Sequence, residues 1–274
     1  MLQKVETLYF ENIKYNDLII NNNQTVKILK DNIDFYIHLN LKENNEQLII
    51  FSNGAIDPNK SKPPVFMRHS WHEDFNASCI FIDDRTVHNN NLRIGWGVGS
   101  EDRHYLMDYS DIGQMIANTL SIQPENTYYY GSSAGGFMSM YLATLHKDTK
   151  AIVNNPQCYV DKYDQTNVNK LYTSIFPDYS TEEIKKKYAI RLSITSLFRQ
   201  KNYVPEIYYV QNRLCSSDMK NQFNPFCNML DRYNIDSTNI KFILYNNLKS
   251  GHAPLQRAGT ITLVNRIIEG NQMT

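Results

Sequence analysis

The sequence has few cysteines, no excess of either charge and no long hydrophobic run. Its four cysteines form no C-x-x-C pair, so a zinc or thioredoxin-like site has no support. Lys plus Arg and Asp plus Glu number 28 each, which argues against the basic surface that non-specific nucleic-acid binding needs. No stretch approaches the roughly 18 apolar residues of a membrane span, and no signal peptide is evident. We therefore expect a cytoplasmic protein with reduced cysteines.

Two patterns that could indicate a cofactor or a metal lack the context that either would need. Residues 95–99 are rich in glycine, but they do not follow a strand and open a helix with G-x-G-x-x-G spacing. His69 and His72 lie three residues apart without a third ligand nearby. We accordingly predict neither a bound cofactor nor a metal ion.

Strand-like runs alternate with helix-like stretches, and neither an internal repeat nor a low-complexity linker interrupts them. Residues 25–30 and 34–40 alternate apolar and polar side chains, as a half-exposed antiparallel pair would. Further strands are predicted at 48–52, 79–82, 127–130, 151–153, 207–210 and 241–245. Helices are predicted from about 108 to 120, after 136, from about 225 to 233 and from 260 to 268. This order implies an α/β fold, a mostly parallel sheet with helices on both faces, in a single domain over residues 1–274.

The segment 160–205 breaks this rhythm. It is polar and basic, and Ser180 with Glu183 forms the capping-box pattern at the start of a Lys-rich helix. We interpret the segment as a cap or lid inserted into the domain.

The sequence Gly131-Ser132-Ser133-Ala134-Gly135 matches the pattern G-x-S-x-G. The pattern is short, but here it lies between a predicted strand and a predicted amphipathic helix, which is the context of a nucleophile turn. That turn is so tight that the positions two before and two after the nucleophile leave no room for a side chain, and both are glycines. Ser133 is therefore the predicted nucleophile.

Two backbone N–H groups are candidates to bind the negative charge that forms on an attacked carbonyl. Ala134 follows the nucleophile at the start of a helix, where the helix dipole favours negative charge. The second donor is expected in the loop after the strand at 48–52, from Gly54 or Ala55, with a glycine allowing close approach of the backbone.

Candidates for the general base of the nucleophile, and for the acid that orients this base, follow the later strands. His252 lies just past the strand at 241–245, and it could be either the base or a surface histidine in a Gly-flanked turn. Asp218 is the first carboxylate after the strand at 207–210; its alternative role is a helix N-cap. Asp231 and Asp236 lie farther along, in or beyond a predicted helix.

Three residues near the expected site are candidates for substrate contact. Trp96 could stack on a sugar ring or pack in the core. Gln157 and Tyr159 follow the strand at 151–153 and so lie at the edge of the sheet where sites in α/β proteins occur.

The order of these motifs resembles the α/β-hydrolase fold over about residues 25–270. Within it, residues 129–137, 155–157, 211–212 and 225–226 look like those of bacterial proteins linked to surface polysaccharides, among them capsule-biosynthesis proteins and accessory-Sec glycan acetyltransferase-like proteins. This resemblance implies an acylated small molecule or glycan as substrate, and protein partners in a polysaccharide pathway. It also implies an acid nearer the strand, at about Cys215, than Asp218 is.

Two functions follow from these patterns. The first is a serine esterase or O-acyltransferase with a Ser-His-Asp triad and an acyl-enzyme intermediate. The alternative is a non-catalytic scaffold of hydrolase fold in a polysaccharide biosynthesis or glycoprotein export complex, because fold alone does not fix function.

Overall fold

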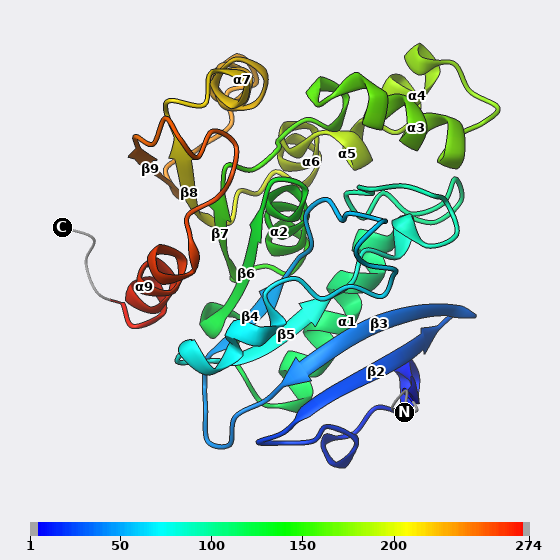
Figure 1. Cartoon of the computed structure of the whole chain (residues 1–274), viewed down its shortest axis with the longest axis vertical. Coiled ribbons are helices and arrows are strands. Elements are labelled where there is room, and N and C mark those ends of the chain that lie inside the picture. The colour runs from blue at the N-terminus through cyan, green and yellow to red at the C-terminus, as the bar shows by residue number, and fades with distance from the viewer. Residues whose placement is uncertain (1–4, 271–274) are drawn as a thin grey trace.

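The computed structural model describes residues 5–270, which form a nine-stranded sheet flanked by helices (Figure 1). The strand order is β1-β2-β3-β5-β4-β6-β7-β8-β9. β3 is antiparallel to both its neighbours, and every other neighbouring pair is parallel. The strands are β1 (Glu6–Tyr9), β2 (Asn23–Lys30), β3 (Ile33–Asn40), β4 (Leu48–Phe51), β5 (Ser78–Ile82), β6 (Thr127–Ser132), β7 (Lys150–Asn154), β8 (Glu206–Asn212) and β9 (Ile240–Tyr245).

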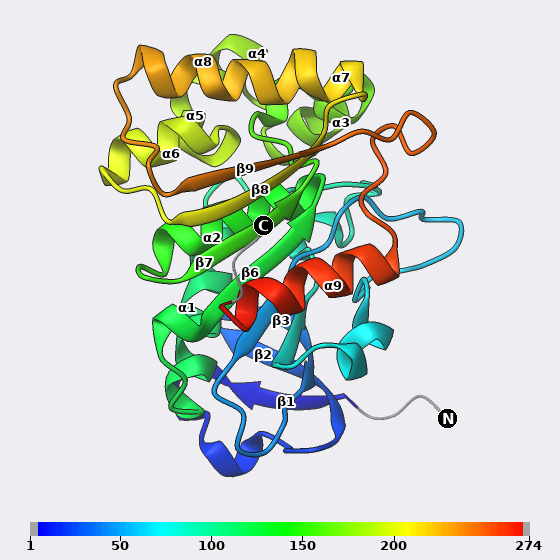
Figure 2. The ribbon, with the colours of Figure 1, turned by 90° about the vertical axis from the view of Figure 1, so that its left-hand side faces the viewer.

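Helices cover both faces of the sheet, and each face has its own apolar core. The helices are α1 (Tyr105–Thr119), α2 (Ala134–Leu145), α3 (Gln165–Ile175), α4 (Thr181–Lys187), α5 (Ala189–Leu192), α6 (Ile194–Lys201), α7 (Ser216–Asp218), α8 (Asn224–Arg232) and α9 (Arg257–Ile268). The larger core joins the sheet to α1, α2 and most of the others. The smaller core lies under α9, which Figure 2 shows across the opposite face.

The observed architecture confirms the predicted α/β fold. Each predicted strand is present, and β2 and β3 form the expected antiparallel pair. The sequence did not indicate β1, because only one side chain of this four-residue strand is buried and so no hydrophobic pattern marks it.

The segment between β7 and β8 contains α3 to α6, in the region predicted to be a cap. Figure 1 shows α3, α4 and α5 grouped at one end of the molecule, at the upper right. The predicted capping box is present: the Glu183 backbone N–H donates to Ser180 Oγ, and the Ser180 backbone N–H donates to the Glu183 carboxylate, 2.8 Å away. That this segment works as a lid stays a prediction.

All four cysteines are free thiols, and Cys79 is buried, as the sequence indicated. Burial raises the pKa of the Cys79 thiol to about 12, so this cysteine stays protonated and unreactive near neutral pH. None of the helices formed by residues 5–270 is long and apolar enough to cross a lipid bilayer.

Candidate active site

Ser133 alone makes the turn between the central strand β6 and helix α2. Its backbone has φ 56° and ψ −125°, a conformation that a residue with a side chain rarely adopts. The two flanking glycines are required by the packing of this turn. A Cβ atom at Gly131 would lie 2.1 Å from the Gly135 carbonyl oxygen, and one at Gly135 would lie 2.6 Å from the Ser52 carbonyl oxygen. The steric expectation for both glycines is therefore confirmed.

The structure brings His252 and Asp218 to this serine in one line of hydrogen bonds. His252 Nε2 lies 2.9 Å from Ser133 Oγ, and His252 Nδ1 lies 2.7 Å from Asp218 Oδ2. Because a carboxylate only accepts, Nδ1 carries a proton and donates a hydrogen bond to Asp218, and Nε2 accepts a hydrogen bond from the serine hydroxyl. The arrangement can take a proton from Ser133 and hold the resulting imidazolium beside a buried carboxylate.

Asp218 reaches the histidine through an irregular helical segment. It ends the short helix α7, and the chain continues from there as a π-helix over Met219–Phe223. Its side chain makes no capping bond to that segment, so the alternative of an N-cap is not supported. Cys215, where the resemblance implied the acid, instead lies at the start of α7. Irregular turns of the π type are frequent at functional sites.

Two buried asparagines hold the loop that carries His252. The Asn155 side-chain amide donates to the carbonyl oxygens of His252 and Ala253, both at 3.1 Å. Asn212 donates to the Gly251 carbonyl oxygen at 2.9 Å, and its own backbone N–H donates to Asn155 Oδ1 at 2.8 Å. These contacts fix the imidazole at the nucleophile. The motifs that contain both asparagines were noted in the sequence, but no role was predicted for either residue.

Gln157 contacts the nucleophile directly. Its side-chain Nε2 donates to Ser133 Oγ at 3.0 Å, and its Oε1 accepts from the Trp96 indole N–H. One hydroxyl can accept from Gln157 and donate to His252 at once, so Gln157 fixes the direction of the serine proton. Trp96 is 0% exposed, which favours packing in the core over stacking on a sugar, the two alternatives that the sequence left open.

The buried carboxylate of Asp84 accepts hydrogen bonds from the loop that carries Trp96. Asp84 accepts from the backbone N–H groups of Thr86, at 3.0 Å, and of Gly97, at 3.2 Å. Burial raises the pKa of Asp84 to about 6, and the two N–H groups oppose that effect because they stabilise the carboxylate.

One of the predicted oxyanion donors has a partner that the sequence did not indicate. The Gly54 N–H donates to Met67 Sδ at 3.3 Å, and a thioether is a weak acceptor that a carbonyl oxygen can replace. Ala55 is exposed. A Cβ at Gly54 would lie 3.5 Å from the nearest atom, the Ser132 carbonyl oxygen, so packing does not require glycine there. Ala134 begins α2, where its N–H has no carbonyl one turn back.

Tyr159 is not brought to the nucleophile. It is 5% exposed, and its hydroxyl is hydrogen-bonded to Thr195 Oγ1 at 3.1 Å, so the predicted substrate contact has no support from its position. Among residues 5–270, no group of three or more His, Cys, Asp or Glu side chains is arranged to hold a metal ion.

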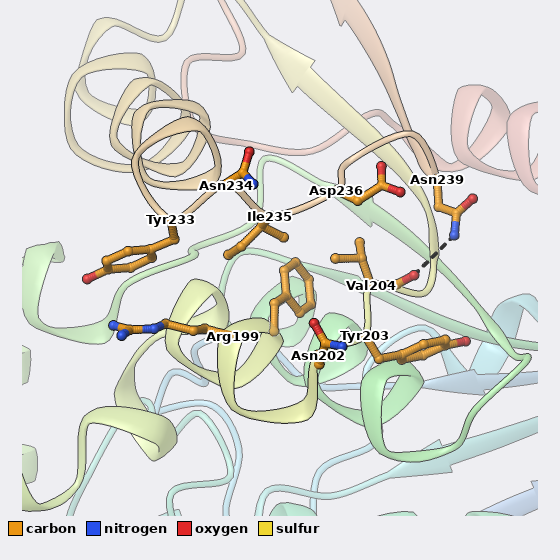
Figure 3. A pocket seen from close by; sticks show the side chains of 10 residues that line it. Arg199, Asn202, Tyr203, Val204, Tyr233, Asn234, Ile235, Asp236 and Asn239 are labelled. Atoms are coloured by element: carbon orange, nitrogen blue, oxygen red, sulfur yellow. Dashed lines mark hydrogen bonds between the residues drawn. The ribbon is translucent and has the colours of Figure 1, made fainter.

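Two cavities of similar size lie at opposite edges of the sheet. One, of about 360 Å³, lies between α6, α8 and the segments that precede β8 and β9 (Figure 3). It is thus at the edge of the sheet where the parallel strands begin, whereas Ser133 follows the end of β6. In this cavity Asn239 donates to the Val204 carbonyl oxygen at 3.2 Å. The other, of about 370 Å³, lies among the loops that follow β4 and β5 and is lined by Ile56, next to Ala55. Only the second is on the same edge as the nucleophile.

We expect Asp218→Asn to lower kcat about 10³- to 10⁴-fold while the protein stays folded, because an amide no longer fixes the Nδ1–H tautomer of His252. Asp231→Asn and Asp236→Asn are the matched controls, since both were alternatives in the sequence; each should retain most of the activity. Steady-state kinetics with an acetyl ester measures this. Equal losses in all three variants would refute the role of Asp218.

No family model matches the sequence, and no curated protein sequence matches it either. A capsule O-acetyltransferase of Neisseria meningitidis serogroup A superposes with a TM-score of 0.63 at 16% identity, over 88% of this chain and 96% of that one. A mutant of that acetyltransferase in complex with CoA gives 0.64 at 17% identity, over 88% and 96%. Carboxyl esterase 2 of the fungus Tuber melanosporum gives 0.61 at 13% identity, over 98% and 92%.

Identities this low establish the fold alone. The sheet order, the helices on both faces and these structures together show that the chain has the α/β-hydrolase fold, as predicted. The capsule-related part of the resemblance has a structural counterpart in the acetyltransferase. The accessory-Sec part stays a prediction.

Proposed function

We propose that the protein is a serine esterase or O-acetyltransferase that acts on an acyl ester of a bacterial surface glycan. The observation that carries the proposal is the unbroken line of hydrogen bonds from Ser133 Oγ through His252 to Asp218. The fold shared with an O-acetyltransferase and an esterase supports the reaction class. The glycan and the partners from a polysaccharide pathway rest on the capsule-related resemblance, whereas the cytoplasmic location rests on the sequence patterns described above.

In this mechanism Ser133 Oγ attacks the acyl carbonyl while His252 Nε2 takes the hydroxyl proton. The N–H of Ala134 and a second N–H near Gly54 bind the oxyanion, after Met67 gives up its contact with Gly54. His252 returns the proton to the leaving alcohol or thiol, which leaves an acyl-enzyme. A second hydroxyl, from water or from a sugar, then attacks the acyl group and restores Ser133.

No feature of the site favours the alternative of a non-catalytic scaffold. The feature of the sequence that slightly favoured that alternative was the distance of Asp218 from the preceding strand, and the Asp218 carboxylate lies within hydrogen-bonding distance of His252.

The test is to detect the acyl-enzyme by intact mass during turnover of 4-nitrophenyl acetate or acetyl-CoA. We expect one acetyl group per protein molecule, together with a burst of released product. Adding a sugar alcohol should then raise turnover and yield its acetate ester if the enzyme is a transferase, and should change nothing if it is an esterase. A folded protein that forms no acetyl adduct with either donor would refute the proposed function.

A further inference from the structure

Arg68 lies between the loop expected to bind the oxyanion and the nucleophile turn. Its Nη2 donates to the hydroxyl of Ser132, the residue before the nucleophile, at 2.7 Å. The residue before it, Met67, is tied to the other loop, since its backbone N–H donates to Asn53 Oδ1 at 2.9 Å and its sulfur accepts from Gly54. Both loops therefore hold this guanidinium at the site.

The charge of Arg68 is not neutralised by the protein. In the part of the chain that the structure describes, Arg103 and Arg257 each pair with an aspartate, but Arg68 has no carboxylate within 4 Å. It lies instead over the rings of Trp71 and Tyr130, at 5.5 and 5.4 Å from their centroids. Aromatic faces hold a guanidinium without cancelling its charge. Ser132 accepts from one of its five N–H donors, and the side chain remains partly exposed.

The backbone at Arg68 is not one that an arginine adopts readily. Among residues 5–270, fourteen residues other than glycine have positive φ; eight are Asn and two are Asp, which tolerate that conformation. The other four are Ser121, Ser133, Trp96 and Arg68. Ser133 is the proposed nucleophile. Trp96 is hydrogen-bonded to Gln157, which donates to Ser133, and Arg68 is hydrogen-bonded to Ser132, which precedes Ser133 in the chain. Strained residues of this kind gather at functional sites.

We propose that Arg68 binds an anionic group of the substrate, a carboxylate or a phosphate, next to the acyl ester. The planar guanidinium suits either group, because its parallel N–H donors match two oxygens of a carboxylate or a phosphate. The inference deepens the proposed function and rests on it, because it specifies which esters the enzyme prefers.

The test compares three acetate esters of phenols: neutral methyl 4-acetoxybenzoate, 4-acetoxybenzoate and 4-acetoxyphenyl phosphate. For each anionic ester we take the ratio of its kcat/KM to that of the neutral ester, which does not depend on the fraction of folded protein. Arg68→Gln should lower this ratio about 10- to 100-fold for the ester whose anion the site binds. A loss for one ester and not the other identifies the anion. Arg266→Gln, which removes an exposed cation on α9, is the control and should leave both ratios unchanged.

Arg68→Lys keeps the charge but loses the planar fork, so its ratio should lie between those of wild type and Arg68→Gln. Ratios that are the same in wild type and Arg68→Gln for both anionic esters would overturn the inference.

Calorimetric binding separates this inference from the proposed function. Ser133→Ala should bind the preferred anionic ester, and Ser133→Ala with Arg68→Gln should bind it about 10- to 100-fold more weakly. If wild type turns over none of the esters and this difference is seen, the anion site stands and the proposed function fails. If wild type turns the esters over and the two variants bind the anionic ester equally, the anion site fails and the function stands.

Discussion

Replacing Ser133 with alanine is expected to abolish acyl-ester turnover, with a loss of about 10⁵- to 10⁶-fold in kcat. The hydroxyl lies 2.9 Å from His252 Nε2, and no other group on the described part of the chain occupies that position. His252→Ala should cost about as much, because members of a triad act as a unit and the loss of either removes the activated nucleophile. Activity that remains in both variants would have to come from oxyanion binding alone.

The matched control is Ser132→Ala, in the same turn. Ser132 Oγ accepts from Arg68, whereas the ring nitrogens of His252 are hydrogen-bonded to Ser133 and Asp218. A fluorophosphonate, which reacts with activated serines, should therefore add once to wild type and to Ser132→Ala, and should not add to Ser133→Ala or His252→Ala. Intact mass reads the result. An adduct on Ser133→Ala, or none on folded wild type, would contradict the assignment of the nucleophile.

Gly135→Ala is expected to destabilise the protein by about 3 kcal/mol, although alanine favours helix more than glycine does. The added Cβ would lie 2.6 Å from the Ser52 carbonyl oxygen and 2.9 Å from that of Asn53, both of them backbone atoms that have no rotamer to change. The displaced 52–54 loop carries an expected oxyanion donor, so activity should fall as well. Denaturant unfolding and acetyl-ester kinetics on the same preparation would measure both effects.

Gly259→Ala is the matched control for this prediction. Gly259 lies in α9, and a Cβ there would have its nearest neighbour, Leu255 Cβ, at 3.7 Å, an ordinary contact. The same substitution should therefore stabilise the protein by up to about 1 kcal/mol and leave activity unchanged. Equal effects of the two substitutions would show that helix propensity, and not the close contact at the nucleophile turn, decides the outcome at Gly135.

Much of the fold was predictable because its signals are local. The apolar runs of β4 and β5 and the alternation of β2 and β3 each occupy a few adjacent residues. The steric requirement for Gly131 is local too, since its contact is with the Gly135 carbonyl oxygen, whereas Gly135 is required by Ser52, which lies on a distant part of the chain. Sheet order added His252 and Asp218 as expectations, because strands in this order bring their following loops to one edge.

The groups that surround the nucleophile were harder to predict from the sequence. Gln157 was expected to contact substrate, which stays a prediction, but its hydrogen bond to Ser133 Oγ was not anticipated. The Tyr159 hydroxyl is hydrogen-bonded to Thr195 and not to the nucleophile. The sequence allowed Trp96 either to stack on a sugar ring in the pocket or to pack in the core, and its complete burial favours the core. The short helix α7 and the π-helix after it place Asp218 beside the histidine, and no pattern of residue types in the sequence indicates them.

The α/β fold and the position of the nucleophile turn could therefore be predicted from the sequence alone, because strand and helix periodicity and the contact of Gly131 with Gly135 involve near neighbours. Which residues meet at that turn depends on tertiary packing. Arg68 and Ser132 are 64 positions apart, Asn155 and His252 97, and Ser133 and His252 119. Contacts over such separations depend on how strands, loops and side-chain rotamers pack together, and single residues chosen for charge or hydrogen bonding leave no periodic pattern in the chain.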